Sequence, residues 1–307
     1  MERVRLMCWC PRVASGMQLP AFAAAEGGLF AKQGLEVEFV HGVTIPDWTL
    51  RGFTTRVKAV ASGDADFALT SVAYLLAAQT DAGGSLPVRF VAISHQRNPI
   101  VALVRADSDL QQAADLQEVR AARWSMPWYA HEYAGALAHM GLAPPRLVDT
   151  AGENLDAALG RGEVDVIPAW MDWLTFYDRD TVVPVRIIPL DIEVYAAGLV
   201  AADRLPLELV TRVRDAFVAG YDLQRNQPEL GIAGFRRRFP DISEEHIRAN
   251  WSLFEPYAFD GVPGSMDPGR WQATIPYTAA THDLSVFPGQ RLFRPELLQR
   301  AREYSPA

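Results

Sequence analysis

The sequence is poor in cysteine and has no excess of positive charge, and each scarcity excludes a class of protein. Its 307 residues include two cysteines, too few for a framework of several disulfides. Cys8 and Cys10 stand at i and i+2 of an expected strand, where both side chains point to one face and are poorly placed to pair with each other. This pattern favours a reducing compartment. The net charge of −8 argues against a nucleic-acid partner.

Long apolar runs are also missing. No segment reaches the roughly 20 apolar residues that a membrane-spanning helix needs. The start of the chain lacks the apolar run of roughly 7 to 15 residues that forms the centre of a secretory signal. We therefore expect no membrane insertion and a cytoplasmic location. If the start has been trimmed, a periplasmic or extracellular-anchored location is the alternative.

The composition that is present is that of a folded protein, with 49% hydrophobic and 21% charged residues. A chain of this length exceeds what one hydrophobic core usually supports, so two lobes are expected. We predict that residues 1–100 and 193–225 form the first lobe and that residues 101–192 form the second. Residues 226–307 are predicted to be a C-terminal helical extension that packs on the first lobe.

Strand and helix patterns alternate along the first two thirds of the chain. A strand is expected over residues 4–10, a helix over residues 19–33 that Gly34 ends, and a second strand over residues 35–40. This βαβ order predicts an α/β protein with mostly parallel sheets flanked by helices. It also places ligands beyond the carboxyl ends of the strands.

The last third of the chain has a helical pattern with interruptions. Helices are expected over residues 207–224 and 243–254, with a short turn around residues 230–239 between them. Beyond Pro256 the chain is rich in Gly and Pro. We expect it to wrap the first lobe before a last helix over residues 295–304.

Three stretches near the start of the chain carry a family likeness. They are residues 24–30 (AAEGGLF), 34–40 (GLEVEFV) and 61–69 (ASGDADFAL). Together they resemble the type II periplasmic-binding-protein-like superfamily, in its sulfonate-binding and thiamine-pyrimidine-synthase-like (NMT1) branch. The resemblance covers nearly all of residues 1–225. It implies a bilobed periplasmic-binding-protein fold, with two mostly parallel sheets and a ligand site in an interlobe cleft.

The loops that follow the expected strands are the candidate ligand site. Several lead into helix N-termini, whose free N–H groups favour anions, and Arg12, Arg51, Arg56 or Arg97 could add a cationic fork. Tryptophans are frequent in these loops; each one could be lobe packing, but as a group they favour a flat or apolar ligand body. We therefore expect a small anionic or aromatic molecule. The candidate substrate-binding residues are Arg12, Trp48, Thr70, Ser71, His95, Arg97, Trp124, Ser125, Trp128, Trp170 and Trp173.

Cys10 is the candidate nucleophile. It ends the first expected strand, precedes Pro11 and faces the expected cleft. A thiolate there could attack an electrophilic carbon or sulfur if a cation or a histidine stabilised it, and His41 and Arg51 are the candidate partners. The alternative is that Cys10 is a small buried apolar residue.

The same residues are also similar to those of the hydroxybiphenyl sulfinate desulfinase family, enzymes that have this fold. Cys10 and the proline after it match a Cys-Pro pair at the end of the first strand, and Arg51 follows His41 by ten residues. Residues 162–165 (GEVD) and 170–173 (WMDW) are similar as well. The resemblance implies that Cys10 acts as nucleophile or proton donor while His41 and Arg51 orient a sulfinate.

Two functions are open at this point, and a third, an intracellular ligand sensor, shares every predicted residue with the second. The first is a cofactor-independent intracellular enzyme, a desulfinase, hydrolase or lyase, that uses Cys10 to break a carbon–sulfur or similar bond. The second is the substrate-binding protein of an ABC transporter for a sulfonate, carboxylate or pyrimidine-like solute, with an ABC permease as partner. Neither hypothesis needs a cofactor or a metal, and no phosphate-binding glycine loop or metal-ligand spacing is seen. The Cys-Pro strand end and the start of the chain place the enzyme slightly ahead.

Overall fold

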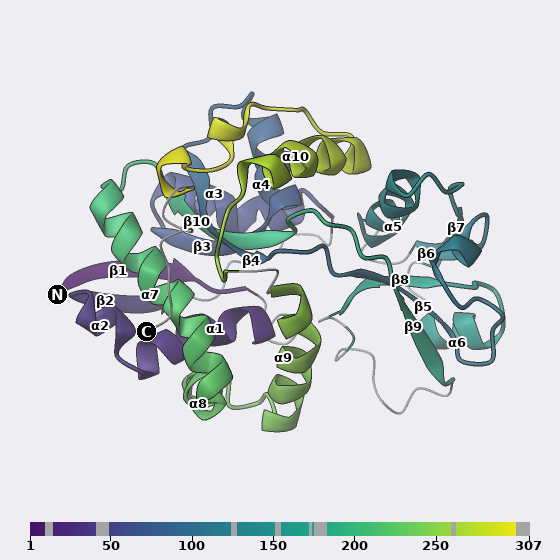
Figure 1. The fold of residues 1–307 in the computed structure, drawn as a ribbon, viewed down its shortest axis with the longest axis horizontal. Helices are drawn as coiled ribbons and strands as arrows, with labels where there is room; N and C mark the ends of the chain where they lie inside the picture. Colours follow the sequence, from purple (N-terminus) through teal and green to yellow (C-terminus); the bar gives the residue numbers. More distant parts are fainter. Residues whose placement is uncertain are drawn as a thin grey trace.

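The computed structural model describes residues 1–9, 15–40, 49–123, 128–150, 155–171, 174, 183–258 and 262–298. Within these ranges the helices and strands gather into two groups, on the left and on the right of Figure 1. We call the group built on a five-stranded sheet the larger lobe, and the group built on a three-stranded and a two-stranded sheet the smaller lobe. The described chain is therefore α/β and bilobed.

The larger lobe is organised around its sheet. The strands are β1 (Glu2–Met7), β2 (Leu35–Val40), β3 (Phe67–Ser71), β4 (Val88–His95) and β10 (Ala197–Ala202). Their order is β2-β1-β3-β10-β4, with β1 parallel to both of its neighbours and β10 antiparallel to both of its own. β3 and β10 are buried along their whole length, in keeping with their central places in the sheet.

Helices cover both faces of this sheet (Figure 1). One face carries α1 (Ser15–Glu26), α7 (Leu207–Asn226), α8 (Pro228–Arg238) and α9 (Glu244–Ala258). The last three of these helices each pack against α1. The other face carries α3 (Thr55–Ser62), α4 (Val72–Asp81) and α10 (Pro268–His282). The short helix α2 (Leu29–Lys32) leads into β2.

The smaller lobe contains β5 (Ile100–Arg105), β6 (Arg120–Arg123), β7 (Arg146–Asp149), β8 (Ile167–Trp170) and β9 (Val185–Pro189), with helices α5 (Trp128–His139) and α6 (Leu155–Gly160). β6 and β7 pair in parallel, whereas β5 is antiparallel to both β8 and β9. The predicted parallel pairing is thus found in β2-β1-β3 and in β6-β7, but not around β5 and β10. The chain enters β5 and β10 as it crosses from one lobe to the other. The first residue of β5, Ile100, is therefore aligned with the last residue of β8, Trp170. In the same way, the first residue of β10, Ala197, is aligned with the last residue of β3, Ser71.

Two expectations for the first elements are corrected. The helix expected over residues 19–33 is divided into α1 and α2, because Gly28 adopts a left-handed backbone with φ of 71° between them. Strand β1 ends at Met7 rather than at residue 10, so Cys8 follows the strand. Cys10 lies outside the described residues.

The C-terminal third is more helical than expected. Residues 230–239 were expected to form a short turn, but most of them belong to α8, which begins at Pro228. α10 was not expected at all. Its first residue is Pro268, and the N–H that proline lacks would have no partner at the first position of a helix. The Asp267 side chain accepts the backbone N–H of Arg270 and caps the helix. Of the last expected helix, the described residues contain a short 3-10 turn at Pro295–Leu297.

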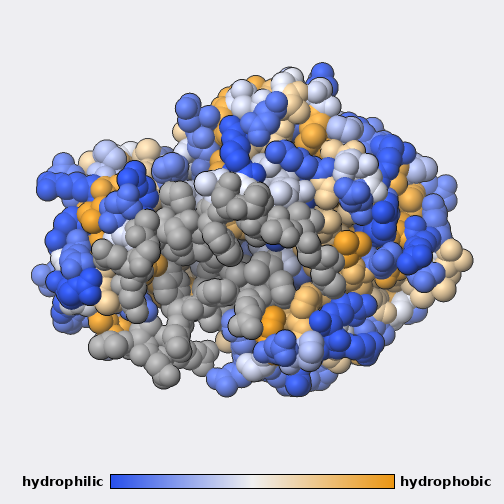
Figure 2. All heavy atoms as spheres, turned by 180° about the vertical axis from the view of Figure 1, so that it is seen from behind, coloured by the Kyte–Doolittle hydropathy of each residue, from blue (hydrophilic) through white to orange (hydrophobic). Residues whose placement is uncertain are grey.

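The visible outer surface is largely hydrophilic, with separate hydrophobic patches on both lobes (Figure 2). Large exposed apolar side chains include Val185 and Ile187 on the edge strand β9 and Leu147 on β7. Among the described residues, no helix combines the length and the apolar character needed to cross a bilayer.

Candidate functional site

The candidate site lies where strand ends of the larger lobe meet the smaller lobe. Thr70 stands near the end of β3, and His95 is the last residue of β4. Met7, the last residue of β1, is aligned with Ala68, so Trp9 and Thr70 each stand two residues beyond this aligned pair, toward the carboxyl ends of the two strands. The carboxyl ends of parallel strands are the usual ligand-binding edge of α/β proteins.

Packed aromatic rings join the two lobes at this edge. Tyr74 of α4 meets Trp128 of α5 edge to face, with ring centroids 5.7 Å apart. The Trp128 ring is 5.8 Å from that of Trp170 in β8, and the Trp170 ring is 5.5 Å from that of His95. We define the interlobe aromatic cluster by its members, each at most 3% exposed: Trp9, Phe53, Tyr74, His95, Trp128, Trp170 and Phe254.

Three predicted substrate-binding residues belong to this cluster, namely His95, Trp128 and Trp170. The fold therefore brings together residues that are distant in the sequence. Among the described residues their rings pack against one another, so a direct contact between these rings and a ligand stays a prediction.

Two polar atoms at the same edge are buried without a hydrogen-bond partner among the described residues. They are the indole Nε1 of Trp9, which is 3% exposed, and the hydroxyl of Thr70, which is fully buried. Burying a polar group without a partner costs roughly 1–3 kcal/mol. An indole N–H and a hydroxyl are both groups that a bound molecule can satisfy.

A buried cation stands beside Trp9. Arg56 of α3 is 4% exposed, and its guanidinium carbon lies 5.1 Å from the centre of the Trp9 ring. A cation over an indole face is held electrostatically. Its charge also acts more strongly on an anion here than at the surface, because less water screens it.

The two other described arginines proposed for the anion are engaged elsewhere. Arg51 donates to the carbonyl of Ala77 at 2.7 Å and pairs with Asp81 at 2.6 Å, and its side chain is 45% exposed. These partners lie toward the carboxyl end of α4, whereas the aromatic cluster gathers at the amino end. Arg97 pairs with Asp191 at 2.9 Å. The guanidinium groups of Arg51 and Arg97 are therefore both paired with carboxylates of the same chain.

The described cysteine is not activated. Cys8 is 5% exposed, and burial raises the pKa of its thiol to about 12, although Arg238 and Arg56 act in the opposite direction. At neutral pH the thiol is therefore protonated and enclosed. This environment is that of a packing residue.

His95 and Ser71 also have structural surroundings. Burial lowers the pKa of His95 to about 3, so its imidazole is neutral at physiological pH, and its ring packs edge-on against Phe254 with centroids 4.7 Å apart. The Ser71 hydroxyl accepts the N–H of Ala73 at 3.1 Å and caps α4. The Ser71 hydroxyl is thus already bonded to the backbone as the N-cap of α4.

The remaining predicted site residues lie outside the described residues, and their roles stay predictions. They are Cys10, Arg12, His41, Trp48, Trp124, Ser125 and Trp173.

Trp9, Tyr74 and Phe254 were missed by the sequence analysis, although Trp9 and Tyr74 carry a usable signal. Trp9 follows the first strand, and Tyr74 stands in the first turn of the helix after β3, positions that face the ligand edge in this topology.

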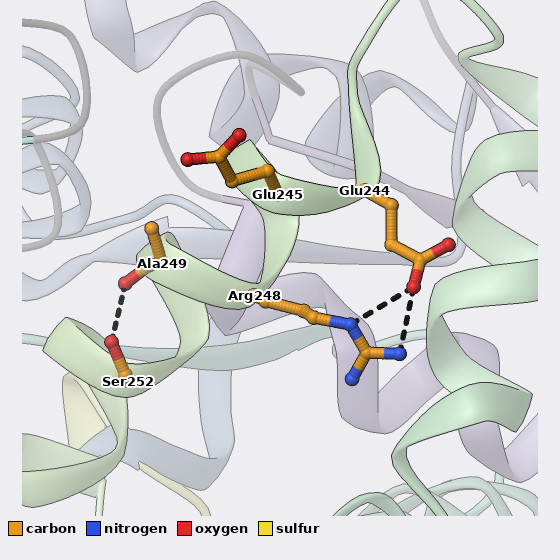
Figure 3. Close-up of a pocket in the computed structure, with 5 residues that line it drawn as sticks. All are labelled: Glu244, Glu245, Arg248, Ala249 and Ser252. Carbon is orange, nitrogen blue, oxygen red and sulfur yellow. Dashed lines mark hydrogen bonds and ion pairs between the residues drawn. The ribbon is translucent and has the colours of Figure 1, made fainter.

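A separate hollow lies on α9 and is shown in Figure 3. It is lined by Glu244, Glu245, Arg248, Ala249 and Ser252. Arg248 pairs with Glu244 at 2.8 Å and with Glu229 at 2.6 Å, and the Ser252 hydroxyl donates to the carbonyl of Ala249. These groups satisfy one another, as expected of a solvated helix face. In the part of the chain that the structure describes, no three or more His, Cys, Asp or Glu side chains gather as a metal site.

A family model described as NMT1/THI5 like matches residues 17–230. No curated protein matches the chain.

Solved structures match the chain over nearly its whole length at low identity. The periplasmic aliphatic sulphonate binding protein SsuA from Escherichia coli is 16% identical with a TM-score of 0.66, over 100% of this chain and 93% of that one. The alkanesulfonate-binding protein SsuA from Xanthomonas axonopodis pv. citri bound to MOPS is 16% identical with a TM-score of 0.58, over 98% of both chains. A cysteine-to-serine mutant of DSZB with biphenyl-2-sulfinic acid is 16% identical with a TM-score of 0.59, over 99% of both. At this identity the likeness shows the fold alone.

Proposed function

The chain belongs to the NMT1/THI5-like family, and from this premise we propose that it is a solute-binding protein that holds a small organic anion between its lobes. One observation carries the proposal. The interlobe aromatic cluster, to which both lobes contribute, adjoins two buried polar atoms without partners among the described residues, Trp9 Nε1 and Thr70 Oγ1. The buried guanidinium of Arg56 lies beside Trp9.

In this proposal the polar groups bind the anionic end of the solute, and the aromatic rings bind the rest of it. The Trp9 N–H and the Thr70 hydroxyl donate to oxygens of the anion, and Arg56 supplies the opposite charge. The rings of Tyr74 and Trp128 contact the flat or apolar part of the solute. A sulfonate or carboxylate suits this arrangement because its oxygens converge at one end of the molecule, where several donors can reach them.

The comparisons support transport over catalysis. Two of the similar structures are sulfonate-binding proteins, one of them described as periplasmic. We infer that this chain works in the periplasm or outside the cell and passes its solute to an ABC permease. Solute binding of this kind requires a selective site and no nucleophile.

The desulfinase-like hypothesis is less well supported. Of its three candidate catalytic residues the structure describes Arg51, which is ion-paired with Asp81 at the carboxyl end of α4. The similarity to DSZB is one of fold.

Binding and turnover measured on the same protein test the proposal. Calorimetry with MOPS, a short alkanesulfonate and biphenyl-2-sulfinate should show saturable one-site binding of at least one sulfonate. Thr70→Val should weaken that binding roughly tenfold or more, the effect of losing one hydrogen bond to a charged group. Thr211→Val is the matched control, because that hydroxyl donates within α7 to the carbonyl of Leu207.

Two outcomes would overturn the proposal. One is the absence of saturable binding for all three compounds. The other is release of sulfite from biphenyl-2-sulfinate that Cys10→Ser abolishes, which would establish the enzyme instead.

A further inference from the structure

A buried carboxylate connects the smaller lobe to α10. Glu132 of α5 has a side chain that is 5% exposed, and one of its oxygens accepts the indole N–H of Trp170. Its other oxygen lies 3.5 Å from Nε2 of His282, the last residue of α10, whose side chain is 2% exposed. Glu132 thus contacts a member of the interlobe aromatic cluster on one side and α10 on the other.

The two helices approach closely around this carboxylate. One turn along α5, a Cβ placed on Gly135 would lie 2.4 Å from the hydroxyl oxygen of Thr281, so a glycine is needed there. One turn further, the ring of His139 meets that of Tyr277 edge to face, with centroids 5.4 Å apart. The contact between α5 and α10 therefore continues along both helices.

The other end of α10 is anchored in the larger lobe. The Trp271 ring stacks on Phe293 with centroids 5.1 Å apart and lies 5.6 Å from the ring of Phe90 in β4. The Thr274 hydroxyl accepts the backbone N–H of Tyr195 at 3.1 Å. A helix of 15 residues is about 22 Å long, and this one is held by both lobes along that length.

We propose that Glu132 is a positioning residue for the binding site: it fixes the Trp170 indole in the interlobe aromatic cluster and, through His282, ties that position to α10. The proposal rests on the proposed function only in taking the cluster as the site. A hydrogen bond from an indole N–H to a carboxylate is charge-assisted and directional, so it sets the orientation of the ring. That orientation places Trp170 between Trp128 and His95.

The indole ¹H–¹⁵N signal of Trp170 in NMR spectra reports this bond without any ligand. Trp170→Phe assigns the signal by removing it. Glu132→Gln should move the signal upfield, because a neutral amide oxygen is a weaker acceptor than a carboxylate. His282→Gln should move it by a smaller amount through Glu132. Glu208→Gln, at an exposed position of α7, is the control and should leave it in place.

Ligand binding then separates positioning from general stability. With MOPS as the probe, Glu132→Gln and Trp170→Phe should each weaken binding severalfold. If Glu132 acts through Trp170, the double variant should bind no more weakly than Trp170→Phe alone. Additive losses would overturn the positioning role.

The spectra decide the proposal even if wild-type protein binds none of the probes, in which case the proposed function fails separately. An unmoved Trp170 signal in Glu132→Gln would overturn the positioning role. An unmoved signal in His282→Gln would overturn the connection to α10.

Discussion

The ring of Tyr74 in the larger lobe meets the indole of Trp128 in the smaller lobe edge to face, with centroids 5.7 Å apart and planes at 84°. Tyr74 also stacks on Trp9 and Phe53, at 5.4 Å and 5.0 Å. This pair is therefore the point at which packing in one lobe continues into the other. It makes the stability of the lobe junction and the shape of the candidate site depend on the same side chains.

Truncating this contact should destabilise the protein. Trp128 is 2% exposed, and Trp128→Ala removes a large buried ring that the surroundings cannot fill, so we expect a loss of about 3–5 kcal/mol in the free energy of unfolding. Urea denaturation followed by circular dichroism measures it. Val286→Ala, at a side chain that is 64% exposed, is the control. A loss below about 1 kcal/mol for Trp128→Ala would show that the junction is not tightly packed.

Thr70→Val should have opposite effects on stability and binding. The Thr70 hydroxyl is buried without a partner among the described residues, so an isosteric methyl group should leave the free energy of unfolding unchanged or raise it by about 1 kcal/mol. Binding of a sulfonate should weaken. Thr274→Val is the matched control, because that hydroxyl bonds both Tyr195 and Arg270, and we expect it to cost about 1–3 kcal/mol. Equal losses from both variants would contradict the assignment of Thr70.

His95 should make the protein acid-sensitive. Burial lowers the pKa of His95 from 6.5 to about 3, so between these values the unfolded chain binds a proton that the folded chain does not. The free energy of unfolding should therefore fall as the pH drops below about 6.5, by up to about 1.4 kcal/mol per pH unit. His95→Phe should have a shallower slope than wild type in urea denaturation between pH 7 and pH 4. His246→Gln, at a partly exposed position, serves for comparison, and identical slopes for wild type and His95→Phe would refute the prediction.

Cys8 should resist alkylation in the folded protein. Its pKa of about 12 leaves only about one thiol in ten thousand ionised at pH 8, and its side chain is enclosed. Treatment with iodoacetamide followed by peptide mass spectrometry should show Cys8 unmodified in native protein and fully modified in 6 M guanidinium chloride. Cys8→Ala confirms the peptide assignment. Rapid modification in the native state would mean that the β1 end is open to solvent.

Gly135→Ala should strain the contact between α5 and α10. The added methyl group would lie 2.4 Å from the Thr281 hydroxyl oxygen, and we expect a loss of about 1–3 kcal/mol in the free energy of unfolding. Thr281→Ala removes the atoms that collide and should recover part of the loss in the double variant. Calorimetric unfolding of the two single variants and the double variant measures this interaction. Strictly additive losses would show that the two residues do not touch.

Much of the fold was predictable because its signals are local. The alternation of residues 35–40 matches β2 at both ends, and the helix expected over residues 207–224 begins where α7 begins and ends two residues before it. Gly34, with φ of 71°, ends its helical segment as expected. Strand alternation and glycine stops depend on neighbours along the chain, so sequence alone reveals them.

The local sequence pattern did not predict α8 or α10. Glycine and proline lower local helix propensity, and packing against the rest of the protein restored the helix at both places. The antiparallel direction of β5 and β10 also depends on which lobe the chain comes from, and no local pattern encodes it.

The sequence therefore indicated the fold class, the family likeness and the strand ends at which a site would form. Tertiary structure decided which side chains meet there. Arg51 forms an ion pair with Asp81, whereas Arg56 lies against the Trp9 ring. Glu132 contacts His282, which is distant in the sequence. The physical reason is that burial, charge pairing and close packing depend on neighbours in space, and these are set only when the whole chain has folded.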